Sequence, residues 1–362
     1  MREVKTTGGK SSTREQSISG EGFHGAFTAL CFLLFLAGCS VVQAGRGTPA
    51  GRFEFGLIGD LQYNAEQEAE FLNLIEDLNR ADLAFVVHDG DFKRSSTPCT
   101  DELFYRRRAE FQTSRHPFIY TPGDNEWTDC HRGGIAGAAD PLERLTKLRE
   151  VFFPGEQSLG QRTLTLTRQS SDPKYAKYRE NARWFYGGVL FATLHIVGSN
   201  DNFGRMPEMD AEHAERSAAN LAWMKQAFDL AERNGSKAVM LIMQADPWFQ
   251  DKWPADYFSR LRTTPPDPKT PSGFSDFLKT LEGEVLAFGK PVVLVHGDTH
   301  YFRIDKPLVG SKSGRVIENF TRVETVGAPD THWVRTIVDP NDPNVFTFKH
   351  EIVKKNLANH PK

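Results

Sequence analysis

The chain has 362 residues, of which 39% are hydrophobic and 25% charged, a composition typical of a globular protein with a sizeable core. Its formal net charge of −3 argues against nucleic acid as a default partner, because a protein that neutralises many phosphates needs a basic face. The length allows one large domain or two smaller ones.

The first 45 residues predict a disordered polar segment followed by an export signal. Residues 1–25 are rich in Ser, Gly and Thr. The stretch AFTALCFLLFLAGCSVVQAG (26–45) then has an apolar core of about a dozen residues, short for a bilayer span and typical of a signal peptide. It contains Leu36-Ala37-Gly38-Cys39, which resembles a bacterial lipobox. We expect an exported protein of the cell envelope or periplasm, bound to the membrane only through a lipid on Cys39. Cleavage after Ala44 and a plain membrane anchor are the alternatives.

Export changes how the remaining cysteines are interpreted. Beyond Cys31 and Cys39, the chain contains only Cys99 and Cys130. Two cysteines in an oxidising compartment have one possible pairing. We therefore predict a Cys99–Cys130 disulfide, with two buried thiols as the alternative.

Strands and helices alternate in the first part of the folded region. Apolar runs at 53–60, 83–91 and 117–124 predict buried strands. Between them, 66–80 has apolar residues at helical spacing, and 101–114 also predicts a helix. This βαβαβ order predicts a parallel sheet flanked by helices.

The second part adds strands that suit another sheet. The stretch 182–201 predicts two strands that turn at Gly187-Gly188, and Gly289 is a good stop for a helix at 274–289. Other expected elements are a strand at 162–168, a long helix at 210–233, strands at 237–247 and from 292, a Pro-rich surface insertion at 253–273, and three tail strands within 315–327, 332–339 and 345–353. No long linker divides 52–362, so we expect one α/β domain with two sheets packed between helices.

Four Gly-Asp pairs each follow an apolar run, and they place Asp60, Asp91, Asp124 and Asp298 at predicted strand ends. In open α/β sheets, ligands bind at the carboxyl ends of the strands. A single Gly-Asp pair is more often a turn that caps a helix. Four carboxylates that converge on one crevice would repel one another unless cations neutralise them. The set therefore indicates a metal site, with two ions that share a carboxylate.

With these pairs in place, the chain resembles the calcineurin-like metallophosphoesterases. That family carries Asp-x-His, Gly-Asp-x-x-Asp, Gly-Asn-His-Asp/Glu, a lone His and Gly-His-x-His in this order. The matching segments here are 59–62, 90–94, 123–126, 243–247 and 297–300. The resemblance covers most of 53–305 and implies a four-layer α/β/β/α sandwich as a single domain at 52–362.

The departures from the family pattern mostly replace nitrogen ligands by oxygen ligands. Gln62 stands for the first His, and Asp298 for the first His of the last block. The others are Asp124 for Asn, Asn125 for His, Gln244 or Asp246 for the lone His, and Arg94 for the second Asp of the second block. A chain that had lost its metal site would more plausibly carry apolar or small residues at these positions.

Carried over residue by residue, the resemblance implies two divalent ions. Asp60, Gln62, Asp91 and His300 would hold one ion. Asp91 as the bridge, Asp124, Asp298 and either Gln244 or Asp246 would hold the other. Such an oxygen-rich set suits Mn²⁺, Mg²⁺ or Ca²⁺ better than Zn²⁺.

The chemistry that the resemblance implies is hydrolysis of a small-molecule phosphoester, a monoester or a diester, by a hydroxide that the two ions share. Asn125 could donate a hydrogen bond to phosphate but could not transfer a proton. His131 or His88 could take the role of the missing His, with Arg132 as a phosphate clamp. An exposed polar loop at 131–132 is the alternative, and His88 and His195 suit packing roles.

A second function remains open at this point, a metal- or phosphate-binding envelope protein of the same fold without turnover. In either function, His296 could orient the metal ligands from beside them. Trp127, Trp248 and Trp253 could stack on a base or sugar, or could belong to the core.

Overall fold

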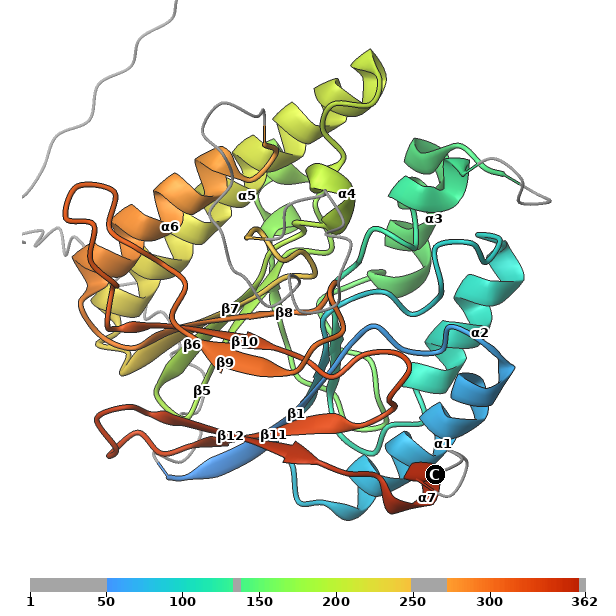
Figure 1. Cartoon of the computed structure of the whole chain (residues 1–362), viewed down its shortest axis with the longest axis horizontal. Helices are drawn as coiled ribbons and strands as arrows, with labels where there is room; N and C mark the ends of the chain where they lie inside the picture. The colour runs from blue at the N-terminus through green and yellow to red at the C-terminus, as the bar shows by residue number, and fades with distance from the viewer. Residues whose placement is uncertain (1–50, 133–137, 249–271, 358–362) are drawn as a thin grey trace, which may run out of the picture. The chain divides into compact units, whose positions relative to one another are not determined.

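Two β-sheets lie face to face between two layers of helices in the computed structural model, which describes residues 51–132, 138–248 and 272–357 (Figure 1). The predicted α/β/β/α sandwich is confirmed. These residues fall within one compact unit, Arg46–Lys362. The predicted export signal with Cys39, Trp253 and most of the Pro-rich segment lie outside the described residues.

The first sheet has the strand order β12-β11-β1-β2-β3. Strands β1, β2 and β3 run parallel to one another, whereas β11 and β12 add antiparallel pairings at one edge. The strands are β1 (Phe53–Ile58), β2 (Val86–His88), β3 (Phe118–Tyr120), β11 (Trp333–Val338) and β12 (Phe346–Glu351).

The second sheet has the order β4-β5-β6-β7-β8-β10-β9. Within it, the neighbouring strands β6, β7, β8 and β10 run parallel to one another. The hairpin β5–β6 turns at Gly187 and Gly188, as predicted, and both glycines have positive φ. The strands are β4 (Thr167–Arg168), β5 (Ala182–Tyr186), β6 (Val189–Thr193), β7 (Ala238–Ile242), β8 (Val292–His296), β9 (Arg303–Asp305) and β10 (Phe320–Glu324).

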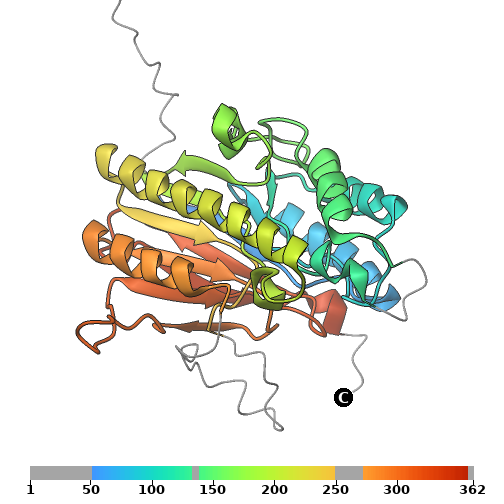
Figure 2. The ribbon, with the colours of Figure 1, turned by 90° about the horizontal axis from the view of Figure 1, so that it is seen from above.

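Helices cover the outer face of each sheet, with α5 and α6 side by side over the second sheet (Figures 1 and 2). Side-chain caps define several helix starts: the Asn64 side chain accepts a hydrogen bond from the Gln67 amide at 2.9 Å. Helix α6 ends at Gly289 with φ of 64°, the predicted stop. The helices are α1 (Ala65–Arg80), α2 (Asp101–Phe111), α3 (Pro141–Phe152), α4 (Gly198–Asp201), α5 (Pro207–Arg233), α6 (Ser275–Phe288) and α7 (Lys354–Leu357), with 3₁₀ turns at Thr128–His131, Gln169–Ser171 and Pro173–Tyr175.

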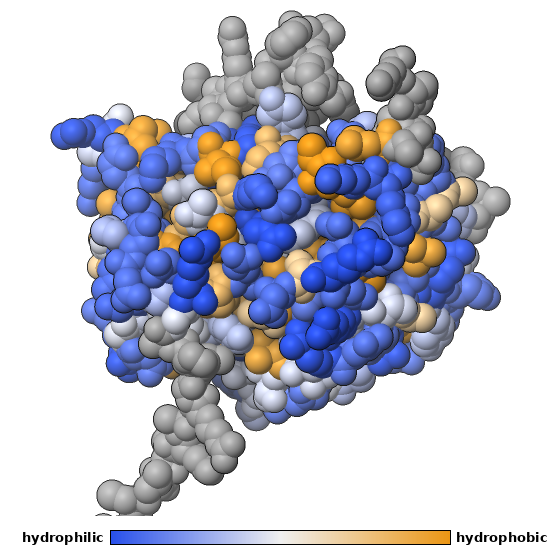
Figure 3. Space-filling view, turned by 90° about the horizontal axis from the view of Figure 1, so that it is seen from below, coloured by the Kyte–Doolittle hydropathy of each residue, from blue (hydrophilic) through white to orange (hydrophobic). Residues whose placement is uncertain are grey.

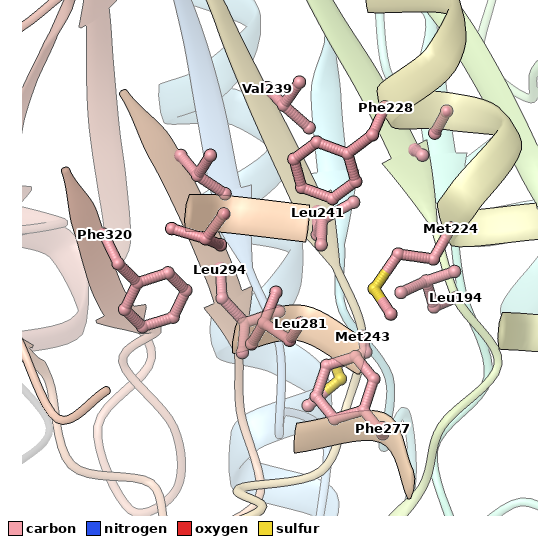
Figure 4. Packing of buried hydrophobic residues seen from close by; sticks show 14 of the residues in the cluster. Leu194, Met224, Phe228, Val239, Leu241, Met243, Phe277, Leu281, Leu294 and Phe320 are labelled. Atoms are coloured by element: carbon pink, nitrogen blue, oxygen red, sulfur yellow. The ribbon is translucent and has the colours of Figure 1, made fainter. Parts of the chain in front are cut away.

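Three large apolar clusters hold the four layers together, beside a small fourth one around Trp127. The period of two along each strand divides its residues between the large clusters. On β7, Met240 faces the other sheet, whereas Leu241 faces the helices. Figure 4 shows the helix-side cluster, where Leu241 lies below Phe228 of α5 and Leu281 of α6 approaches Leu294 of β8. Each such fully buried side chain contributes about 1.5–3 kcal/mol by leaving water.

The surface is consistent with this layering. Hydrophilic residues cover most of the face in Figure 3, and apolar residues lie between them in small groups. None of the helices in the described ranges combines the length and the apolar character that crossing a bilayer requires.

The predicted Cys99–Cys130 disulfide is present, with a Cα–Cα distance of 5.8 Å. It ties the segment before α2 to the 3₁₀ turn at Thr128–His131, in the loop that follows β3. The disulfide therefore restrains the chain next to the third Gly-Asp pair.

Candidate metal centre

The ends of five parallel strands converge and deliver the predicted ligands. Strands β1, β2 and β3 end just before Asp60, Asp91 and Asp124, and in the second sheet β7 and β8 end just before Gln244 and Asp298. Hydrogen bonds connect these loops across the two sheets, since the amide of Asp298 donates to Asp60 Oδ2 at 3.0 Å.

The backbone at these positions is strained. Non-glycine residues with positive φ are uncommon, and ten occur in the described chain. Five of them are predicted ligands: Asp60 (52°), Gln62 (66°), Asp91 (59°), Asp298 (77°) and His300 (63°). Four more are the consecutive residues 199–202, beside the same site. Strained backbone persists only where the surroundings enforce it and gathers at functional sites, so this clustering itself points to function.

The glycines of the Gly-Asp pairs make room for another carboxylate. A Cβ atom on Gly123 would lie 2.0 Å from Asp91 Oδ1, and one on Gly297 would lie 2.0 Å from Asp60 Oδ2. Glycine is therefore required at 123 and 297, because the carboxylates of Asp91 and Asp60 fill the space that a side chain would need.

The first group of donors consists of Asp60, Asp91 and His300. The Nε2 atom of His300 lies 3.5 Å from Asp60 Oδ1, and Nδ1 lies 2.8 Å from the carbonyl oxygen of Ala328. Because a carbonyl only accepts, Nδ1 carries the hydrogen and Nε2 presents its lone pair to the centre. A backbone partner of this kind orients a histidine for metal binding.

Gln62 lies beside this group. Its Nε2 donates to Glu110 Oε2 of α2 at 2.7 Å, and its Oε1 is buried without a hydrogen bond. The oxygen is thus available to a cation, while the nitrogen is held by α2.

The second group places Gln244 among three carboxylates. Its Nε2 lies 3.2 Å from Asp91 Oδ2, 3.4 Å from Asp124 Oδ1 and 3.2 Å from Asp298 Oδ1. Its Oε1 accepts the amide of Gly198 at 2.6 Å, which fixes the orientation of the side chain. Gln244 therefore presents hydrogens to the carboxylates, where the resemblance implies a ligand atom.

Asp246, the other residue that could replace the lone His, does not join this centre. It forms ion pairs with Arg303 and Arg322, the latter at 3.2 Å. Asp246, His296 and Glu324 lie close enough together to hold an ion. Arg303 pairs with Glu324 as well, at 2.6 Å, so two guanidinium groups already neutralise these carboxylates.

Two further side chains complete the interior of the centre. Asn125 donates from Nδ2 to Asp91 Oδ2 at 2.8 Å, so it orders a predicted ligand. The Tyr63 hydroxyl lies 3.3 Å from both Asp60 and Asp91, and 3.2 Å from His300. Nothing in the sequence pointed to Tyr63, because a tyrosine next to a predicted ligand follows no metal-binding pattern.

A basic rim borders the second group of carboxylates. The Ser199 hydroxyl joins Asp124 (2.7 Å) to the buried Asp129 (3.2 Å). Asp129 in turn pairs with Arg132 at 2.7 Å and lies 4.0 Å from Arg205. Ser199 and Arg205 were not predicted, although the Gly-Ser that follows β6 repeats the pattern of a glycine and a polar residue after a strand.

The remaining candidates lie on the rim or in the core. His131 is exposed, with Nδ1 3.3 Å from Arg205 Nη1. His88 is fully buried among aromatic rings, and burial lowers its pKa to about 3. His195 is also fully buried and lies 2.8 Å from Glu180. Trp127 and Trp248 are core residues, 0% and 4% exposed.

The carboxyl groups of the centre lie in surroundings that disfavour their ionised form unless cations are bound. Burial, and then neighbouring carboxylates, raise the pKa values of Asp60, Asp91 and Asp298 well above the usual range. Burial and the adjacent Asp129 raise the pKa of Asp124 to about 7. Ionised carboxylates this close together are stable only beside positive charge. The oxygen-rich donor set with one imidazole therefore fits divalent cations, which would displace the protons.

Comparisons with known proteins agree with this geometry. The family model of the calcineurin-like phosphoesterases matches residues 53–302, more than half of the chain. The match confirms the resemblance drawn from the five sequence blocks. No curated protein matches the chain significantly.

Several solved structures are similar at low identity. A dimetal phosphatase from Danio rerio has 14% identity and a TM-score of 0.49, with 83% of this chain and 96% of that one covered. PhoD has 12% identity and a TM-score of 0.48, with 82% of this chain and 65% of PhoD covered. Purple acid phosphatase PPD1 from yellow lupin seeds has 11% identity and a TM-score of 0.47, with 86% of this chain and 53% of that one covered. The chain spans less than two thirds of the last two, and similarity at this level says nothing about its substrate.

The role of Gly297 can be tested through metal affinity. Gly297→Ala should push the Asp60 carboxylate out of the centre and weaken Mn²⁺ binding at least about tenfold in calorimetric titration. Gly283→Ala is the matched control, because a Cβ atom at this position in α6 meets nothing within 4 Å. Equal Mn²⁺ affinities of the two variants would contradict the close-packing argument.

The orientation of Gln244 predicts two unequal metal positions. The second ion should bind more weakly than the first, because the amide hydrogens occupy the space between Asp91, Asp124 and Asp298. Gln244→His supplies a ligand nitrogen and should tighten the weaker site at least about tenfold. Gln244→Ala, which removes the donor without adding a ligand, should fall short of that gain. Two equally tight sites in the unmodified protein would refute this interpretation.

Proposed function

Since the chain belongs to the calcineurin-like phosphoesterase family, we propose that it hydrolyses small phosphate monoesters or diesters in the bacterial cell envelope. Members of this family are metal-dependent hydrolases, so the enzyme class predicted from the sequence is confirmed. One observation supports the active-site assignment above the others: the buried Asp60, Asp91 and Asp124, the partly buried Asp298 and one oriented imidazole lie where five parallel strands end.

The two groups of donors have distinct tasks. Asp60, Asp91 and His300 would hold the first ion, and Asp91, Asp124 and Asp298 the second. When bound, divalent cations supply Lewis-acid polarisation of the phosphoryl group and lower the pKa of water. We propose Mn²⁺, Mg²⁺ or Ca²⁺, because oxygen donors outnumber nitrogen donors.

The basic rim is suited to the phosphate group. Arg132 and Arg205 both lie against Asp129, which the Ser199 hydroxyl links to Asp124. A guanidinium presents several N–H donors in one plane and can bind two phosphate oxygens at once. We therefore place the substrate phosphate between the carboxylate centre and these two arginines.

Protonation of the leaving group requires a residue other than Asn125. Its amide cannot transfer a proton, and it already donates to Asp91 and to the Tyr63 hydroxyl at 3.2 Å. His88 is enclosed in the core. His131 is solvent-exposed beside Arg205, so we propose it as the proton donor.

The cysteines and the N-terminal segment support a site of action in the cell envelope. A disulfide between Cys99 and Cys130 supports an oxidising compartment. The apolar segment that ends at Cys39 supports export with a lipid anchor.

Activity measurements test the enzyme directly. With added Mn²⁺, the protein should hydrolyse p-nitrophenyl phosphate, bis-p-nitrophenyl phosphate or both. Asp91→Asn should lower kcat at least about a hundredfold without unfolding the chain, since it removes the shared carboxylate. Asp276→Asn, an exposed change in the first turn of α6, is the control and should keep full activity. Full activity in Asp91→Asn would remove the site assignment.

The same assay separates the alternative function. Protein that binds Mn²⁺ but cleaves neither ester would act as a metal- or phosphate-binding envelope protein. The missing third-block histidine is the observation that favours this second reading.

Lipid attachment can be tested in cells. A bacterial host fed radioactive fatty acid should label the full chain, and Cys39→Ala should lose the label. Cys31→Ala, a second cysteine of the same segment, should keep it. A label that persists in Cys39→Ala would rule out the anchor.

A further inference from the structure

The Tyr63 hydroxyl has more acceptors around it than hydrogen bonding can use. Asp60 Oδ1 and Asp91 Oδ2 each lie 3.3 Å away, and His300 Nε2 lies 3.2 Å away. A phenol has one hydrogen and can donate to one of these three atoms. Asn125 already donates to the same oxygen from 3.2 Å. The single hydroxyl hydrogen therefore satisfies only one of these three contacts.

Three of these atoms are spaced like donors around a cation. His300 Nε2 is 3.5 Å from Asp60 Oδ1, and the hydroxyl lies 3.3 Å from Asp60 Oδ1 and 3.2 Å from His300 Nε2, while Asp91 Oδ2 is 3.3 Å from the hydroxyl on another side. Donors about 2.1 Å from one ion lie roughly 3.0 Å apart in an octahedron and roughly 3.4 Å apart in a tetrahedron. An ion shared by the hydroxyl, Asp60 and His300 needs only small adjustments of these side chains, whereas Asp91 has to move closer, because it does not lie within 4.8 Å of both Asp60 and His300.

The local sequence explains why a tyrosine takes this place. Gln62 stands where the family pattern has a histidine, and its amide nitrogen is held by Glu110 of α2 at 2.7 Å. Tyr63 is the next residue in the same turn. Its ring stands edge-on to His300, with the centroids 5.2 Å apart, and its amide nitrogen is fixed by the Gln67 side chain at 2.8 Å.

We propose that the Tyr63 hydroxyl is a direct ligand of the first divalent ion, completing the set formed by Asp60, Asp91 and His300. Tyr63 would then supply the donor that the family pattern places at residue 62, with the Oε1 atom of Gln62 beside it. The proposal rests on the metal centre of the proposed function and adds a ligand that the family pattern does not supply.

Mn²⁺ binding to the full metal-free protein tests the proposal. Tyr63→Phe removes only the hydroxyl and should weaken binding of the tighter ion at least about tenfold in calorimetric titration. Tyr105→Phe is the matched control, because Tyr105 lies on α2 with 51% exposure and should bind Mn²⁺ as the unmodified chain does.

A spectroscopic readout separates a ligand from a merely structural tyrosine. Mn²⁺ should change the near-ultraviolet absorbance of tyrosine in the unmodified protein and in Tyr105→Phe, but not in Tyr63→Phe. Tyr63→His, which returns a ligand atom to this position, should recover part of the affinity without the tyrosine signal. Circular dichroism confirms that each variant is folded.

The outcomes distinguish this proposal from the one on which it rests. If Tyr63→Phe binds Mn²⁺ as tightly as Tyr105→Phe with the same change in absorbance, Tyr63 is not a ligand and the metal centre stands without it. If Gln62→Ala weakens binding whereas Tyr63→Phe does not, Gln62 is the ligand instead. If the unmodified protein binds no Mn²⁺, both proposals fail.

Discussion

The parallel alignment of strands from two sheets is the constraint on which the site depends. Parallel strands bring their carboxyl ends to one edge, and here β1, β2 and β3 meet β7 and β8 from the opposite sheet. Each loop has to turn sharply there, and the left-handed backbone of Asp60, Asp91 and Asp298 provides that turn while it aims the carboxylates inward. The glycines before Asp124 and Asp298 allow these loops to approach within contact of other carboxylates. This left-handed backbone would be unfavourable in an isolated loop, and it persists here because the loops pack against one another.

Carboxylates gathered in this way carry negative charge that other groups have to balance. Two neighbouring clusters, around Asp246 and around Asp91, balance it differently. Around Asp246, Arg303 and Arg322 provide permanent positive charge, so this cluster is closed and structural. Around Asp91 the partners are neutral donors, Asn125 and Gln244, which lessen repulsion without supplying charge. Buried carboxylates with only neutral donors keep raised pKa values and remain ready to exchange protons for cations. The difference between the two clusters explains why Asp246 is a poor ligand although it lies two residues after Gln244.

The sequence predicted those parts of the fold and site that local pattern determines. Apolar runs followed by Gly-Asp located Asp60, Asp91, Asp124 and Asp298 at strand ends, and an even cysteine pair predicted the disulfide. Helix α3 and strand β9 were not predicted; β9 has only three residues, too few to show a period of two. The choice between Gln244 and Asp246 depends on which side chain meets the arginines, and Arg303 and Arg322 are far away in sequence. Tyr63 and Arg205 belong to the site only through contacts that the folded chain creates, so no local pattern indicates them.

Asp91 links the two groups of donors through a single oxygen atom. Its Oδ2 receives Asn125 at 2.8 Å and Gln244 at 3.2 Å, and it lies 3.3 Å from the Tyr63 hydroxyl. An ionised carboxyl oxygen can accept several hydrogen bonds, but each donor draws electron density from the same lone pairs. On the side of the first position, Tyr63 is only partly buried, whereas on the side of the second, Gln244 is fully buried and its Oε1 accepts the amide of Gly198. An ion at the first position would therefore disturb fewer fixed contacts than an ion at the second.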